Sequence, residues 1–236
     1  MSEPTFRAYG ENAATFLIFQ ELATTSGAIQ NVFVKNLKHF GTGKVSKWSI
    51  NSDHQDVWMF PNFGKSKGFG EPDVLALVGQ YLFWIEVETS ISCKNSIPAL
   101  QNALLQLRRF RLLSHAIAQS KQKKKGEYRI LGSTIKNDRE SREAEVRIKG
   151  HRVFQKIYTR MENSVRSGND HYVLFSINQP RGDQYGYARA LRNQLENVNK
   201  IGQLQQLESA RCWYAYWKGD LEAKYKITDE ENAALK

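Results

Sequence analysis

Cysteine is scarce in this 236-residue chain, and long apolar segments are absent. With only Cys93 and Cys212, the chain needs no disulfide, and its five scattered histidines do not combine with the cysteines into zinc-ligand spacing. No apolar run approaches the roughly 20 residues that span a bilayer. The residues Met1–Thr5 lack the basic-then-apolar pattern of a secretory signal. We therefore expect a cytoplasmic protein that does not bind membranes.

Glycine-rich nucleotide motifs are also missing. The sequence has neither a Walker-type motif nor a dinucleotide-binding motif, so nucleotide hydrolysis is not supported. There is no internal repeat and no clear linker, and the length suffices for one sizeable core. We predict a single α/β domain over residues 1–236, with a core at about 8–135 and a C-terminal α/β elaboration at about 136–236.

Positive charge is in excess. The chain has 34 Lys and Arg against 24 Asp and Glu, which gives a formal net charge of +10. Such an excess attracts polyanions through solution, so nucleic acid is the leading partner.

The hydrophobic pattern predicts alternating helices and strands. Two long helices are expected at residues 11–25, ending near Gly27, and from Pro98 to about Ile117. Two buried strands at 74–78 and 81–87 are joined by a tight turn at Gly79-Gln80. The remaining predictions are loops around a short strand within 41–70, strands at 128–135, 172–177 and 212–217, and a helix at 187–207.

Three acidic residues stand out against the predicted hairpin. Pro72-Asp73 opens its first strand, and Glu86 and Glu88 lie two positions apart on the second. Side chains alternate across a strand, so the two glutamates share one face. Equidistance from the turn brings Asp73 opposite Glu86. Acids inside so apolar a run are costly unless a cation compensates them.

A divalent metal ion would provide that compensation. Mg²⁺, with Mn²⁺ as a substitute, prefers oxygen ligands and keeps several waters. Asp73, Glu86 and Glu88 are the candidate ligands, and a metal-bound water could attack a phosphodiester. The structural alternative is an edge hairpin whose acids lie on a solvated face.

These residues resemble the motif of the PD-(D/E)XK nucleases: Pro-Asp, a spacer, then Asp or Glu, any residue, and Lys. Pro72-Asp73 and Glu86-Val87-Glu88 match every position except the last. The resemblance implies a restriction-endonuclease-like core of helix, three-stranded meander, helix and strand, and the order of elements from Glu11 through Ile135 is similar to it. Glu88 stands where most members carry lysine, although some restriction endonucleases of this superfamily also end their motif in Glu.

The resemblance implies further site residues. Lys94 could reach back to replace the missing lysine, or Glu88 could orient the water itself. Family members often add an acid from the first helix, for which Glu11 is the natural position and Glu21 the alternative. Gln101 or Gln106 on the second long helix could support the site.

Basic and aromatic residues suggest nucleic-acid contacts. Arg108 and Arg111 share a helical face with His115 and could bind phosphates. Lys123, Lys124 and Lys125 could extend that surface. A merely solvated basic face is the alternative. The aromatic residues at 213–217 could stack on bases or fill a core.

The leading hypothesis is a Mg²⁺-dependent DNA endonuclease from prokaryotic defence, restriction or a mobile element. RNA remains open as a substrate, and a homodimer fits because one site serves one strand. The alternatives are a catalytically inactive nucleic-acid-binding module on a nuclease scaffold and a protein-interaction domain.

Overall fold

A computed structural model gives the fold of the chain. It describes residues 10–48, 50, 55–61, 71–89, 97–119, 122–124, 127–136, 140–149, 152–177, 184–200 and 206–217.

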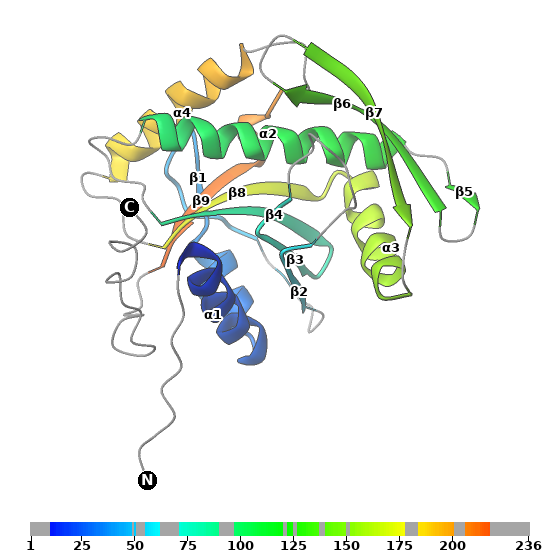
Figure 1. The fold of residues 1–236 in the computed structure, drawn as a ribbon. Coiled ribbons are helices and arrows are strands. Elements are labelled where there is room, and N and C mark those ends of the chain that lie inside the picture. The colour runs from blue at the N-terminus through cyan, green and yellow to red at the C-terminus, as the bar shows by residue number, and fades with distance from the viewer. Residues whose placement is uncertain are drawn as a thin grey trace.

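A mixed six-stranded sheet forms the centre of this α/β protein (Figure 1). Its order is β1-β9-β8-β4-β3-β2. The meander β2-β3-β4 is antiparallel, whereas β4, β8 and β9 run parallel to one another, and β1 closes the far edge antiparallel to β9. The strands are β1 (Lys38–His39), β2 (Gln55–Met59), β3 (Val74–Val78), β4 (Tyr81–Glu88), β8 (Asp170–Ser176) and β9 (Cys212–Tyr216).

Helices cover both faces of this sheet (Figure 1). On one face lies α1 (Gly10–Thr24), followed by the short helical segments η1 (Ile29–Phe33) and η2 (Val34–Asn36). On the other face, the long helix α2 (Ile97–Gln119) packs with α3 (Arg152–Arg166) and α4 (Gln184–Asn199). A short 3₁₀ segment, η3 (Ser209–Arg211), leads into β9.

Each covered face has its own hydrophobic core. Leu75, Trp84 and Tyr172 belong to the core on the α2 side, where Leu107 and Phe110 of α2 pack. The alternate strand residues point to the other face and pack against α1 and η1. They include Val74, Ile85, Val87 and Phe175. Burial on both faces explains why β3 and β4 are apolar at almost every position.

A second, three-stranded antiparallel sheet lies beyond α2. It consists of β5 (Gln122–Lys124), β6 (Glu127–Lys136) and β7 (Glu140–Lys149). β6 forms close to the predicted strand at 128–135, but it belongs to this small sheet. The strand that follows α2 in the main sheet is instead β8, which lies parallel to β4.

Most predicted elements of the described chain are confirmed. α1, α2 and the β3–β4 hairpin form as expected, and Gly79 takes the positive φ of 61° that the tight turn needs. β2, β8, β9 and α4 also form near their predicted positions. α3 and β7 are not among the predicted elements. Within the described residues, no helix is both long and apolar enough to span a bilayer.

Candidate functional site

The acidic residues of the hairpin converge at the carboxyl end of β4. Val74 pairs with Ile85 in the antiparallel hairpin. The next pair away from the turn is therefore Asp73 and Glu86, which face each other as the sequence predicted. The Asp73 carboxylate accepts a hydrogen bond from the backbone N–H of Val87 at 2.8 Å. Since Trp84 belongs to the core on the α2 side, strand alternation places Glu86 and Glu88 on that same face.

β4 is a central strand, which corrects the alternative reading of an edge hairpin. β3 lies on one side of it and β8 on the other, with Glu86 beside Leu174 and Glu88 beside Ser176. The acids are therefore set into the interior of the sheet and not along a solvated margin.

Glu11 joins the cluster from the first turn of α1. Its Oε2 accepts hydrogen bonds from the backbone N–H of Thr89 at 2.8 Å and from the Thr89 hydroxyl at 3.0 Å. These bonds tie the start of α1 to the end of β4. The charge of Glu11 also raises the pKa of Asp73, Glu86 and Glu88.

Burial and mutual repulsion disfavour the charged forms of Asp73, Glu86 and Glu88. Burial, followed by the charges of Asp73, Glu88 and Glu11, raises the pKa of Glu86 to about 9. Burial also raises the pKa of Asp73 to about 6, although the Val87 N–H opposes this. The pKa of Glu88 rises to about 7, through burial and then the charges of Glu11 and Asp73. We name Glu11, Asp73, Glu86 and Glu88 the acidic cluster.

Arg109 of α2 is a site residue that the sequence analysis missed. Its charge opposes the rise in the pKa of Glu86. Its guanidinium also donates to the Gln106 side chain at 3.0 Å, and its Nε is buried without a hydrogen-bond partner. The usable signal was helical spacing: Arg109 lies three residues after Gln106, which was already expected to support the site, and so belongs to the same side of α2.

The donor chemistry of the acidic cluster fits a hard divalent cation. Among the described side chains, no three His, Cys, Asp or Glu are arranged as a ready chelating group. Mg²⁺, however, is commonly held by one or two carboxylates and keeps its other ligands as water. The raised pKa values show that the charged forms of these carboxyl groups are unfavourable in the metal-free protein. A bound cation would stabilise those charged forms.

Several other predicted site residues lie partly or wholly outside the part of the chain that the structure describes. Lys94 and Lys125 fall outside the described residues. Lys123 and Lys124 belong to β5, and only their backbone is described. Gln101 lies partly buried on α2.

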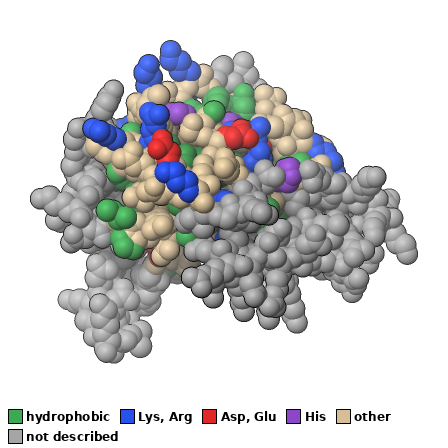
Figure 2. Space-filling view, turned by 90° about the horizontal axis from the view of Figure 1, so that it is seen from above, with side chains coloured by type: hydrophobic (Ala, Val, Ile, Leu, Met, Phe, Trp, Pro, Cys, Tyr) green, Lys and Arg blue, Asp and Glu red, His purple; other side chains and the backbone are tan. Residues whose placement is uncertain are grey.

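The predicted basic face of α2 is corrected by the structure. Arg108 is fully buried and donates to the Val198 carbonyl at 2.6 Å, so it cannot meet a phosphate at the surface. Arg111 has a side chain only 15% exposed and pairs with Glu208 at 3.1 Å. Figure 2 shows that on the face seen from above, Lys and Arg side chains stand in separate groups with acids between them.

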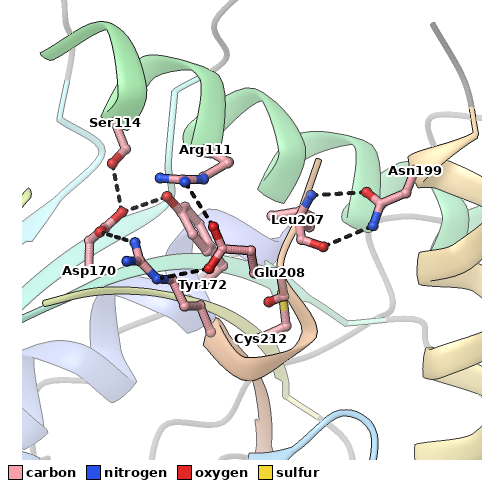
Figure 3. Close-up of polar contacts among 9 residues, drawn as sticks. Arg111, Ser114, Asp170, Tyr172, Asn199, Leu207, Glu208 and Cys212 are labelled. Atoms are coloured by element: carbon pink, nitrogen blue, oxygen red, sulfur yellow. Dashed lines mark hydrogen bonds and ion pairs between the residues drawn. The ribbon is translucent and has the colours of Figure 1, made fainter. Parts of the chain in front are cut away.

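Arg111 belongs instead to a polar network at the opposite end of the parallel strands (Figure 3). Asp170, at the start of β8, accepts hydrogen bonds from Ser114 at 2.6 Å, Tyr172 at 2.5 Å and Arg211 at 2.8 Å. Glu208 bridges Arg111 and Arg211. The network joins α2 to β8 and to the segment before β9, which is a structural role.

Comparison with known proteins adds no relative: no protein-family model, no curated protein and no solved structure matches this chain.

Proposed function

We propose that this protein is a Mg²⁺-dependent endonuclease that hydrolyses phosphodiester bonds in DNA. The observation that carries the proposal is the acidic cluster itself: carboxyl groups from α1, from the start of β3 and from the end of β4 meet at one buried edge. A setting in prokaryotic defence, restriction or a mobile element follows from the resemblance to PD-(D/E)XK nucleases.

The arrangement of elements supports a restriction-endonuclease-like core. α1, the β2-β3-β4 meander, α2 and the parallel strand β8 follow the order helix, meander, helix, strand. β5 to β7 and α3 lie between α2 and β8 in the sequence. In this interpretation, they are an insertion into the core.

Asp73 and Glu86 would hold the metal ion. Mg²⁺ bound there would polarise the phosphate and help a water molecule to ionise. Asp73 is fixed in orientation by the Val87 N–H, and Glu11 is fixed by Thr89. Such preset ligands lose little freedom when a substrate binds.

Glu88 is suited to take the proton from the attacking water. Strand alternation places its carboxyl group on the same face as Glu86, and a divalent cation bound beside it would favour the ionised form that can accept a proton. The water oxygen forms a bond to phosphorus and gives its proton to Glu88, while the bond to the leaving oxygen breaks and that oxygen takes up a proton from solvent. Arg109 supplies positive charge beside Glu86, which offsets the negative charge that develops on the phosphate.

Supercoiled plasmid incubated with Mg²⁺ or Mn²⁺ tests this proposal. The wild-type protein should nick it, and Asp73→Asn and Glu86→Gln should each reduce nicking by at least about 100-fold, the scale of a lost transition-state contact. Glu71→Gln is the matched control, because Glu71 is an exposed acid two residues from Asp73. Nicking that survives in both site variants would refute the assignment.

One observation favours a second candidate, a nucleic-acid-binding module without catalysis. Glu88 occupies the position at which most members of the resembling family carry lysine. This candidate predicts salt-sensitive DNA binding that Asp73→Asn leaves unchanged, with no metal-dependent cleavage by the wild type.

A further inference from the structure

A cavity of about 320 Å³ lies on the α1 side of the sheet, beyond the acidic cluster. It opens between α1, the helical segments η1 and η2, and the carboxyl ends of β8 and β9. Its volume is at the lower end of the range for small-molecule sites, about 300 to 1,000 Å³. Four aromatic side chains line it: Phe33, Phe175, Tyr216 and Trp217.

Two polar side chains also line this cavity. Asn36 is exposed at its rim, and the Lys38 ammonium lies 5.3 Å from the centre of the Tyr216 ring. An aromatic lining with one ammonium group suits a flat ring that is joined to an anionic group.

The cavity lies mainly on the face of the sheet opposite Glu86 and Glu88, but both sites are at the edge formed by the carboxyl ends of the parallel strands. β4, β8 and β9 are parallel, and their registers place Glu88, Ser176 and Tyr216 side by side on successive strands. Two strand spacings separate Glu88 from Tyr216, which is about 10 Å. A stacked strand rises about 3.4 Å per nucleotide, so this gap corresponds to roughly three nucleotides.

We propose that the cavity holds one unpaired base of a nucleic-acid strand whose phosphodiester lies at the acidic cluster. The proposal rests on the proposed nuclease function and specifies its substrate as a strand with unpaired bases. A base in a duplex is stacked and paired, and would have to flip out to enter the cavity. The aromatic rings stack on the base, Lys38 contacts a neighbouring phosphate, and the net charge of +10 favours the polyanion.

An abasic scan tests this site. The probe is a fluorescently labelled 12-nucleotide single strand of mixed sequence, as DNA and as RNA, titrated with the full-length protein in EDTA so that no metal-dependent cleavage occurs. One base is removed at a time. Loss of the base that fills the cavity should weaken binding roughly 5- to 100-fold, while loss at most other positions should change it little.

Two variants connect the effect to the cavity. Val32 lines it and is 47% exposed, so Val32→Trp should fill the mouth without disturbing the core and should abolish the position dependence. Phe16→Trp, which adds a tryptophan at a 41% exposed position of α1, is its control. Lys38→Gln should weaken binding several-fold more than Lys35→Gln, which removes an equal charge outside the cavity.

Each outcome decides between the two proposals. Equal binding of all abasic strands, no single-strand binding, or an unchanged scan with Val32→Trp would each refute the cavity proposal. If the wild-type protein still nicks plasmid in those cases, the nuclease proposal stands. A position-dependent scan that Val32→Trp abolishes, with no Mg²⁺-dependent cleavage of either the plasmid or the labelled single strand, would support base binding and refute the nuclease. A scan that is positive with only DNA or only RNA identifies the strand.

Discussion

At the scale of single residues, the acidic cluster lowers the stability of the metal-free folded protein as the pH rises. Glu86 lies among three other carboxyl groups, with Arg109 as the positive charge that opposes the rise in its pKa. Ionising Glu86 in the folded protein is therefore costly when no cation is bound. A bound divalent cation would relieve that cost, so ligand binding and folding stability should be linked at this edge.

Glu86→Gln should stabilise the metal-free protein at pH 8. Folded Glu86 keeps its proton to about pH 9, whereas the unfolded group loses it near 4.5. The folded state therefore holds more protons between these values, and the free energy of unfolding falls as the pH rises through them. Glutamine removes this effect, and we expect a gain of about 1–3 kcal/mol in urea unfolding at pH 8 in EDTA.

The control for this prediction is Glu196→Gln. Glu196 is an exposed acid on α4, and its replacement should change the free energy of unfolding by less than about 1 kcal/mol. Mg²⁺ should raise the melting temperature of the wild type but not that of Glu86→Gln. A variant less stable than the wild type at pH 8 would contradict the electrostatic account.

His171 should make the protein sensitive to acid. Burial, together with Arg211 and against the opposing effect of Asp170, lowers the pKa of His171 to about 4. Its Nδ1 accepts a hydrogen bond from the Trp213 indole at 3.3 Å, which requires that nitrogen to be unprotonated. The unfolded state gains a proton near pH 6.5 and the folded state only near 4, so stability is lost as the pH falls through this window.

The expected loss from His171 is about 2–3 kcal/mol between pH 6.5 and 4. His171→Asn should flatten that part of the pH profile in urea unfolding. His115→Asn should do so less, because His115 is less buried and its pKa is lowered by a smaller amount. Identical profiles for the wild type and His171→Asn would show that the ring does not titrate in this way.

At the scale of elements, α2 is attached to the sheet by apolar packing and by one buried hydrogen bond. Its apolar residues pack on β4 and β8 along its length, and Ser114 donates to Asp170 at the start of β8. Arg211, just before β9, donates to the same carboxylate. One buried acid thus connects a helix and two strands that lie far apart in the sequence.

Asp170→Asn should destabilise the fold by about 3–5 kcal/mol, since it removes the buried charge that pairs with Arg211 and leaves Arg211 only the more exposed Glu208. Ser114→Ala should cost less, about 1.5–3 kcal/mol, the usual contribution of a hydrogen bond to a charged group. Arg192→Ala, which breaks an exposed ion pair on α4, should cost less than about 1 kcal/mol. Urea unfolding measures all three, and equal costs would argue against a central role for Asp170.

At the scale of the whole molecule, positive charge is concentrated in one part of the chain. Residues 121–150, which include β5 to β7, contain ten Lys and Arg against five Asp and Glu. This segment therefore carries five of the ten net positive charges of the protein. Arg108 and Arg111 interact with other groups of the protein. Residues 121–150 are therefore the strongest remaining candidate for contacts with a nucleic-acid backbone.

Replacing Lys123, Lys124 and Lys125 by Gln should weaken duplex DNA binding and flatten its salt dependence. Each lost phosphate contact lowers the slope of log K against log salt by about 0.9, so the slope should fall by up to about 3. Binding by anisotropy from 50 to 200 mM salt measures this. The triple replacement of Lys35, Lys44 and Lys200 by Gln removes the same charge elsewhere, and an equal effect would mean that only net charge matters.

The local elements were determined largely by the sequence itself. The β3–β4 hairpin follows from two apolar runs around Gly79, and its register follows from the turn, which places Asp73 opposite Glu86. α1 and α2 follow from their apolar spacing. α3 was missed even though Phe154, Ile157, Met161 and Val165 recur at helical intervals, because they follow a highly charged stretch.

Only the tertiary structure decided which distant segments meet. The pairing of β4 with β8 joins residues more than 80 positions apart and leaves no local pattern, so strand 128–135 could not be distinguished from β8 as the neighbour of β4. The burial of Arg108 depends on a carbonyl of α4, and the approach of Arg109 to Glu86 depends on how α2 lies across the sheet. Sequence spacing identifies the acidic residues, because it depends on local order alone. Tertiary packing determines their pKa values and their interaction partners, because these depend on burial and on neighbouring charges from distant segments.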